Sequence, residues 1–159
     1  KMNVNRSARI HKTYKPSAEI LETIESINEK QIWMVITEEW CGDSAQNLPH
    51  IAEWAKLNDN IDLKIVLRDE NVDIMENYLT NGTMSIPILV AFDETGNQLF
   101  TWGPRPKEAA ELVKQLKSEG MEKKDFIEKL HLWYGRNRGK AIESEFLEVL
   151  KNSKVNELV

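Results

Sequence analysis

The stretch QIWMVITEEWCGDS, residues 31–44, joins an apolar run to the single cysteine of the chain. Gln31–Thr37 is continuously apolar and rich in β-formers, which is typical of a strand covered on both faces. Cys41 follows after a short loop, and a helical pattern runs from Cys41 to Leu57. Pro49 lacks a backbone N–H and should interrupt and kink this helix. The stretch therefore predicts a strand, a loop and a helix that begins at the cysteine.

Helical and strand patterns alternate on either side of this stretch. The other predicted elements are helices that start at Ser17 and cover Val72–Leu79 and Pro106–Ser118, and strands over Ile61–Leu67, Pro87–Phe92 and Gln98–Trp102. Strands separated by helices pair in parallel, and the last two strands form a hairpin across residues 93–97. The predicted class is an α/β fold with a central mixed sheet flanked by helices.

Three parts are expected along the chain. Residues 1–14 show no periodicity and are predicted to form an N-terminal arm, and residues 15–119 form the α/β domain. Residues 120–159 form a C-terminal helical extension, which begins after Gly120 and carries many large apolar side chains. Left exposed, these side chains would make a larger apolar patch than soluble monomers tolerate, so the extension should pack on the domain. The alternative is that these helices form a homodimer with a second copy.

Composition limits the class of protein. The 159 residues are 41% hydrophobic and 30% charged, which indicates a globular chain of about one domain. A net charge of −5 argues against a nucleic-acid binder. The chain has no apolar run long enough to span a membrane and no basic start followed by an apolar segment, so we expect a cytoplasmic protein without membrane contact. One cysteine excludes an internal disulfide and an all-cysteine metal site within one chain.

Four motifs in order resemble the thioredoxin family. They are Trp40-Cys41-Gly42, the proline at position 49, the loop Gly82-Thr83-Met84-Ser85-Ile86-Pro87 before an apolar strand, and Gly103 after the last strand. The resemblance covers about residues 17–119 and implies a thioredoxin-like fold with a cis peptide bond before Pro87. Three positions depart from the family pattern: Asp43 replaces a proline, Ser44 replaces the second cysteine, and Val35 replaces a buried aspartate. The whole chain resembles a bacterial thioredoxin-like branch with one active-site cysteine.

The chemistry expected of Cys41 follows from its place at a helix start. A thiolate attacks disulfides far faster than a thiol, and free N–H groups and the positive end of the helix dipole stabilise a thiolate. The hydroxyl of Ser44, one turn on, could donate to the sulfur. Asp43 either places an unfavourable charge beside the sulfur or caps the helix. We therefore name Cys41, Ser44 and Asp43 as candidate catalytic residues.

The missing second cysteine sets the expected mechanism. Ser44 cannot resolve a mixed disulfide, so an external thiol has to do so, and the predicted function is monothiol thiol–disulfide exchange with protein or small-molecule thiols and disulfides. The resemblance makes Trp40, Gly42, Ile86 and Pro87 the candidate substrate-binding residues. No cofactor and no metal are expected, because His50 and His131 lack further ligands at metal spacing and are interpreted as solvated or packed side chains.

Two other functions stay open. Cys41-Gly42-Asp43-Ser44 also resembles the C-G-F-S motif of monothiol glutaredoxins, which hold an iron–sulfur cluster with glutathione across a dimer. Against this, Asp43 replaces the aromatic residue of that motif. The second is a non-catalytic module that keeps the fold, has lost the redox pair, and binds an extended peptide beside Pro87.

Overall fold

A four-stranded mixed sheet in the order β2-β1-β3-β4 forms the centre of the computed structural model, which describes residues 1–157, with side chains as far as Lys154. The strands are β1 Gln31–Thr37, β2 Ile61–Leu67, β3 Ile88–Asp93 and β4 Gln98–Trp102. β1 runs parallel to β2 and antiparallel to β3, and β3 and β4 form an antiparallel hairpin. This is the thioredoxin-like α/β architecture that the sequence predicts, with helices around the sheet and at the C-terminal end.

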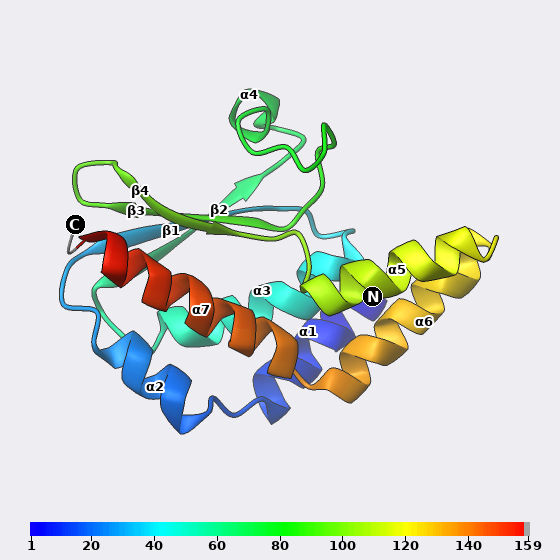
Figure 1. Ribbon diagram of the computed structural model, residues 1–159, viewed down its shortest axis with the longest axis horizontal. Coiled ribbons are helices and arrows are strands. Elements are labelled where there is room, and N and C mark those ends of the chain that lie inside the picture. Colours follow the sequence, from blue (N-terminus) through cyan, green and yellow to red (C-terminus); the bar gives the residue numbers. More distant parts are fainter. Residues whose placement is uncertain (158–159) are drawn as a thin grey trace.

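Helices cover one face of the sheet more fully than the other. The described residues form α1 Met2–Thr13, α2 Ala18–Glu25, α3 Gly42–Ala55, α4 Val72–Met75, α5 Lys107–Ser118, α6 Lys123–Asn137 and α7 Lys140–Glu157. Figure 1 shows α2, α3 and α7 below the sheet and the short α4 on the opposite side. None of the described helices combines the length and apolarity needed to span a membrane.

The main core lies between the sheet and the larger helical layer. Trp33 and Val35 of β1 are fully buried there against Trp54 of α3 and Phe146 of α7. The alternate residue Ile36 points to the opposite face, where a smaller cluster contains Cys41 and Met75. This alternation follows from the two-residue period of a strand, and it places the cysteine at the edge of the smaller cluster.

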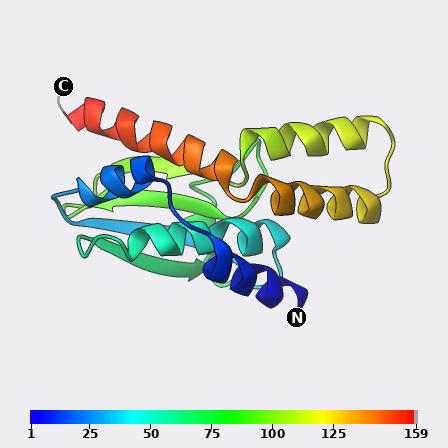
Figure 2. The same cartoon turned by 90° about the horizontal axis from the view of Figure 1, so that it is seen from below.

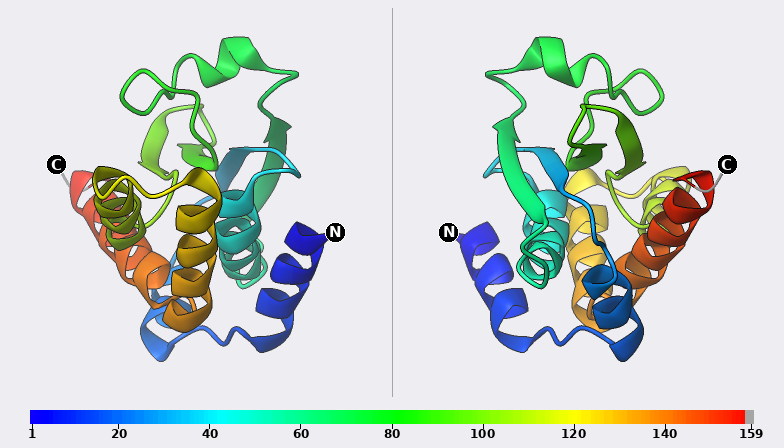
Figure 3. Two further views of the ribbon diagram at one scale, coloured as in Figure 1. Left: turned by 90° about the vertical axis from the view of Figure 1, so that its right-hand side faces the viewer. Right: turned by 90° about the vertical axis from the view of Figure 1, so that its left-hand side faces the viewer.

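Helix α1 corrects the prediction of an arm without periodicity at residues 1–14. It lies along α3, and Figures 2 and 3 show the two helices side by side. The sequence pattern is weak because only Ile10 of α1 is buried. A polar contact also joins the helices, since the Ser7 hydroxyl donates to the carbonyl of Ala45 at 3.1 Å.

That contact explains how α3 accommodates Pro49. The predicted interruption is wrong, because α3 is a single helix of 14 residues with Pro49 inside it. A proline has no N–H for the carbonyl four residues earlier, which here is Ala45. Ser7 supplies the missing donor from α1.

Helix α4 is shorter than the predicted helix Val72–Leu79. It ends at Met75, and Thr80 and Thr83 form a bridged turn after it.

The C-terminal segments attach to the rest of the fold in two ways. α5 and α6 pair as a hairpin around a cluster of their own, which contains Val113 and Leu130 (Figure 2). α7 instead returns to the sheet and adds four apolar side chains to the main core: Ile142, Phe146, Leu147 and Leu150. Glu145 of α7 also accepts hydrogen bonds from the Trp102 indole and from the backbone N–H of Lys107. α7 is therefore part of the main core.

Candidate active site

Cys41 is the N-cap residue of α3. Its sulfur accepts a hydrogen bond from the backbone N–H of Ser44 at 3.5 Å, as a capping side chain does. The thiol also donates to the carbonyl oxygen of Ile86 at 3.5 Å. The residue is 9% exposed, and its sulfur contacts both the helix start and the loop that precedes β3. The backbone N–H of Ser44, in the first turn of α3, is placed to stabilise negative charge on this sulfur.

Ser44 meets the sulfur through its backbone and not through its hydroxyl. The Ser44 Oγ is buried and has no hydrogen-bond partner among the described residues. The expected donation from this hydroxyl to the sulfur is therefore absent from the structure. The side chain occupies the position one helical turn beyond the cysteine, at 3% exposure.

The loop beside the sulfur has a particular backbone shape. The Ile86–Pro87 peptide bond is cis, as the resemblance implies, and the Gly103–Pro104 bond is cis as well. Gly103 has φ +128° and lies against Pro87, so a Cβ at this position would be 2.2 Å from the Pro87 carbonyl oxygen. Only glycine fits there. Ile86 and Pro87 are both buried, and of the two it is Ile86 whose carbonyl reaches the sulfur.

Asp43 belongs to a polar network with the C-terminal half of the chain. Its Oδ2 accepts from Arg105 Nη2 at 2.6 Å, and its Oδ1 accepts from the Tyr134 hydroxyl at 2.6 Å. The Tyr134 oxygen accepts in turn from Asn47 at 3.0 Å. Burial and then the Asp43 charge raise the pKa of Tyr134 well above its ordinary value, so the phenol stays a donor. The cap on first-turn amides expected of Asp43 is not found, because its two carboxylate oxygens accept from Arg105 and Tyr134 instead.

His131 of α6 covers the backbone next to the cysteine. A Cβ at Gly42 would lie 2.7 Å from Nε2 of His131, so only glycine leaves room for the ring. Gln46 of α3 holds the other ring nitrogen at 3.0 Å. Burial and Arg6 lower the pKa of His131, against an opposing effect of Asp43. Of the two states expected for this histidine, solvated or packed, the structure shows the packed one, and the contact joins α6 to the first turn of α3.

Trp40 is the exposed aromatic residue of the site. It is 58% exposed, and the Arg68 guanidinium lies over its ring, 4.8 Å from the centroid. Arg68 also donates to the Met84 carbonyl in the loop that leads to Pro87. Arg68 therefore joins the loop before the cysteine to the loop before the proline. No local sequence signal identified Arg68, Arg105 or Tyr134, because each acts through a partner distant in sequence.

The described residues contain no group of three or more histidine, cysteine or acidic side chains that could hold a metal ion. The arrangement around Cys41 can do nucleophilic chemistry at sulfur, with one hydrogen-bond donor on that sulfur and an exposed aromatic surface beside it.

Comparisons with solved structures agree with this architecture. A protein of unknown function from Pseudomonas aeruginosa superposes with a TM-score of 0.73 at 19% identity, covering 96% of this chain and 86% of that one. An HIV epitope-scaffold superposes with a TM-score of 0.69 at 20% identity, covering 95% and 86%. At these identities the likeness shows a shared fold. A search of curated proteins found no matching relative. A comparison with protein families matches residues 1–117 to the family described as Thioredoxin, and the chain therefore belongs to the thioredoxin family.

Proposed function

We propose that the protein carries out monothiol thiol–disulfide exchange through Cys41. The observation that carries the proposal is the position of the sulfur at the start of α3, where it accepts the Ser44 backbone N–H. Backbone N–H groups at a helix start favour the thiolate, which is the form that attacks disulfides. The described part of the chain holds no second thiol, because Cys41 is the only cysteine in the sequence.

The proposed reaction has two exchange steps. The Cys41 thiolate attacks one sulfur of a disulfide, forms a mixed disulfide with it, and releases the other sulfur as a thiolate. An external thiol then attacks the substrate sulfur of the mixed disulfide and releases Cys41. One disulfide and one thiol are consumed and one of each is formed, so the reaction needs no net oxidant or reductant.

The surface beside the sulfur supports a protein or peptide as the disulfide substrate. Trp40 and Met84 are exposed at 58% and 39% on the two loops that Arg68 joins. Exposed aromatic and methionine side chains are common at surfaces that bind partners. Small-molecule disulfides are the other substrate class that we propose, because a compact molecule needs less room than a peptide to reach a sulfur that is 9% exposed.

The test measures exchange between 2-hydroxyethyl disulfide and excess glutathione, with mass spectrometry to trap the mixed disulfide on the protein. Cys41→Ser should abolish catalysed exchange and leave no adduct. The matched control is the double variant Cys41→Ser with Ser118→Cys, which keeps one thiol but moves it to the end of α5, where the helix dipole is reversed. We expect the double variant to react about tenfold more slowly than the wild type, since a favourable helix terminus contributes up to about 2 kcal/mol. Equal rates would contradict a special role for position 41.

Ser44→Cys gives an independent check of the mechanism. It restores a second thiol at a buried position whose hydroxyl has no hydrogen-bond partner in the structure. Oxidation should join the two cysteines. The reduced variant should convert one equivalent of disulfide to two thiols without an external resolving thiol, because its second thiol displaces the substrate sulfur and closes an intramolecular disulfide. Two free thiols after oxidation would contradict the proposed geometry.

A binding module without catalysis is the second candidate. It is favoured by the burial of Cys41 and by its donation to the Ile86 carbonyl, since that contact stabilises the protonated thiol. In that case Cys41→Ser would leave peptide binding unchanged. Alkylating reagents would then react with Cys41 no faster than with the thiol of the Cys41→Ser, Ser118→Cys control.

A further inference from the structure

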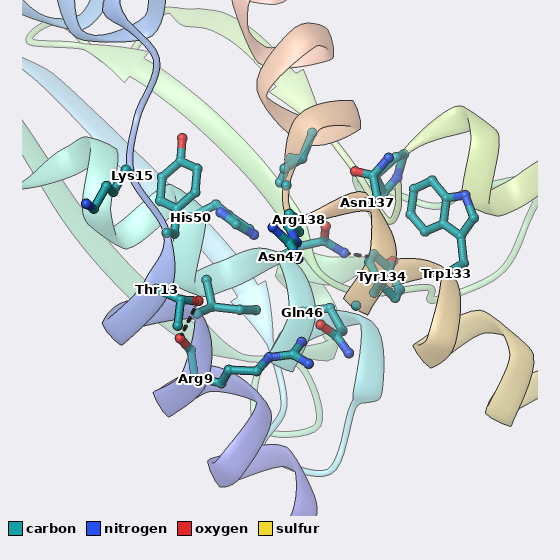
Figure 4. Close-up of a pocket in the computed structure, with 16 residues that line it drawn as sticks. Arg9, Thr13, Lys15, Gln46, Asn47, His50, Trp133, Tyr134, Asn137 and Arg138 are labelled. Atoms are coloured by element: carbon teal, nitrogen blue, oxygen red, sulfur yellow. Dashed lines mark hydrogen bonds between the residues drawn. The ribbon is translucent and has the colours of Figure 1, made fainter.

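A cavity of about 620 Å³ lies between α1, α3, α6 and α7, away from the sulfur. Its walls come from the end of α1 and the residues after it, one face of α3, and the turn that joins α6 to α7 (Figure 4). Cys41 is not among the lining residues. A volume of this size accommodates a small organic molecule.

The cavity is positively charged in a chain that is negative overall. Three cations line it, Arg9, Lys15 and Arg138, and no aspartate or glutamate does. None of these three cations forms an ion pair with another residue among those the structure describes. The net charge of the whole chain is −5, so this local excess of positive charge is opposite in sign to the charge of the whole chain. Arginine forks match the two oxygens of a carboxylate or phosphate.

A buried imidazole without a partner faces the same space. His50 is 4% exposed, lines the cavity, and has a buried Nδ1 with no hydrogen-bond partner among the described side chains and backbone. Figure 4 shows its ring turned toward Arg138 and Asn47. Burial, and to a lesser extent His11, lower the pKa of His50 to about 4, so the neutral ring offers one donor and one acceptor. Buried polar groups in native proteins nearly always have a partner, and its absence here points to a ligand or bound solvent.

Arg138 occupies a backbone position that favours other residues. It ends α6 with φ +55° and ψ +33°, a left-handed conformation in which glycine or asparagine is usual. Gly139 follows with φ +80° and lies against the His50 ring. A Cβ at Gly139 would be 2.4 Å from Cε1 of that ring. Glycine is needed at position 139 because a side chain there would collide with His50. No such steric reason explains the arginine at position 138, which lines the cavity.

The remaining walls are aromatic, aliphatic and amide groups. Tyr14 packs edge-on against His50, and its hydroxyl is occupied by Glu143 and Trp54. Trp133 lies on the opposite side of the cavity from Lys15 in Figure 4. Gln46 and Asn47 supply side-chain amides from α3. The walls therefore offer apolar surface for a ligand's body as well as charge for an acidic group.

We propose that this cavity is a binding site for a small organic anion, in which Arg9 and Arg138 hold a carboxylate or phosphate and the aromatic walls hold a compact apolar group. Carboxylate and phosphate share the chemistry that the arginines recognise, and the probes distinguish between them.

The test uses isothermal titration calorimetry on the full chain with four probes. Phenyl phosphate and phenylacetate carry an anion and a ring, inorganic phosphate lacks the ring, and benzyl alcohol lacks the charge. We expect one of the two ring-bearing anions to bind more tightly than inorganic phosphate and benzyl alcohol. Failure of both ring-bearing anions to bind at millimolar concentration overturns the proposal, and so does equal binding of benzyl alcohol.

Two variants locate the binding. Arg138→Asn removes the charge and keeps a residue suited to the left-handed backbone, so the fold is retained. It should weaken the anion about tenfold or more, as should Arg9→Gln, because a hydrogen bond to a charged group contributes that much. Arg136→Gln, on the same helix but outside the cavity, is the control and should bind as the wild type does. Unchanged affinity in the Arg9→Gln, Arg138→Asn double variant overturns the site.

Discussion

The two helices after Gly120 differ in what holds them to the protein. α7 is attached by apolar side chains that enter the main core, with Phe146 fully buried between Trp33 and Trp54. α6 packs on α5 through a separate apolar cluster, and its attachment to α3 is by polar contacts, through Tyr134 on Asp43 and His131 on Gln46. The difference suggests a division of tasks: α7 supplies stability to the whole domain, and α6 fixes the first turn of the helix that carries Cys41.

The largest expected effect is on the apolar attachment. Phe146→Ala removes a ring at the centre of the core and should lower the free energy of unfolding by about 3–5 kcal/mol. Urea denaturation followed by circular dichroism measures this loss. Leu132→Ala is the matched control, because Leu132 is 51% exposed on α6, and it should change stability by less than about 0.5 kcal/mol. Similar losses in both variants would show that α7 has no special place in the core.

The polar attachment is tested by Tyr134→Phe, which removes one hydroxyl and keeps the ring. Asp43 then loses a charged hydrogen bond and Asn47 loses an acceptor, so unfolding should become easier by about 1.5–3 kcal/mol. Hydrogen exchange should show the loss of protection concentrated in α6 and the first turn of α3. The control is Tyr78→Phe, whose hydroxyl has no hydrogen bond within the described structure. Uniform loss of protection across the sheet would contradict the division between α6 and α7.

The turn between the two helices lies on His50 and makes stability depend on pH. Since burial lowers the folded-state pKa of His50 to about 4, the unfolded state binds a proton first as the pH falls. The contribution of His50 to the free energy of unfolding is complete above about pH 6.5. Below that pH the free energy of unfolding falls, by about 2 kcal/mol at pH 5. His50→Gln should reduce the loss between pH 8 and pH 5 by that amount, measured by urea denaturation at both pH values. The comparison with the variant separates His50 from His131, whose pKa is also lowered. An unchanged pH dependence would show that His50 is not buried by the turn.

The local parts of the fold could be predicted from the sequence. The apolar runs predict β1, β2 and β4 with the bounds that the structure has, because a buried strand needs a continuous run of such residues. The helix predicted to start at Ser17 is α2, and Ser17 is its N-cap, which accepts the N–H of Ile20. The position of Cys41 at the start of α3 also follows from local sequence, where a strand ends and a helical pattern begins.

The parts that depend on distant contacts could not be predicted. The partners of Asp43 are 62 and 91 residues away along the chain, so its local context suggested a cap or a charge on the sulfur. α1 buries a single residue of its 12, and periodicity analysis detects helices by their buried face. The cavity combines residues from four helices, and no contiguous sequence motif predicts it.

The hydrogen bond from Ser7 to Ala45 has a consequence for where this domain begins. α3 contains a gap in its own backbone ladder at Pro49, and the donor that pairs with the free carbonyl of Ala45 is Ser7, 38 positions before Ala45. A recombinant domain trimmed to start at residue 15 would keep every strand and the cysteine, yet it would expose an unpaired carbonyl halfway along the helix that carries Cys41. The shortest fragment that preserves the reactive helix intact is therefore longer than the sheet and its motifs suggest, and it includes α1.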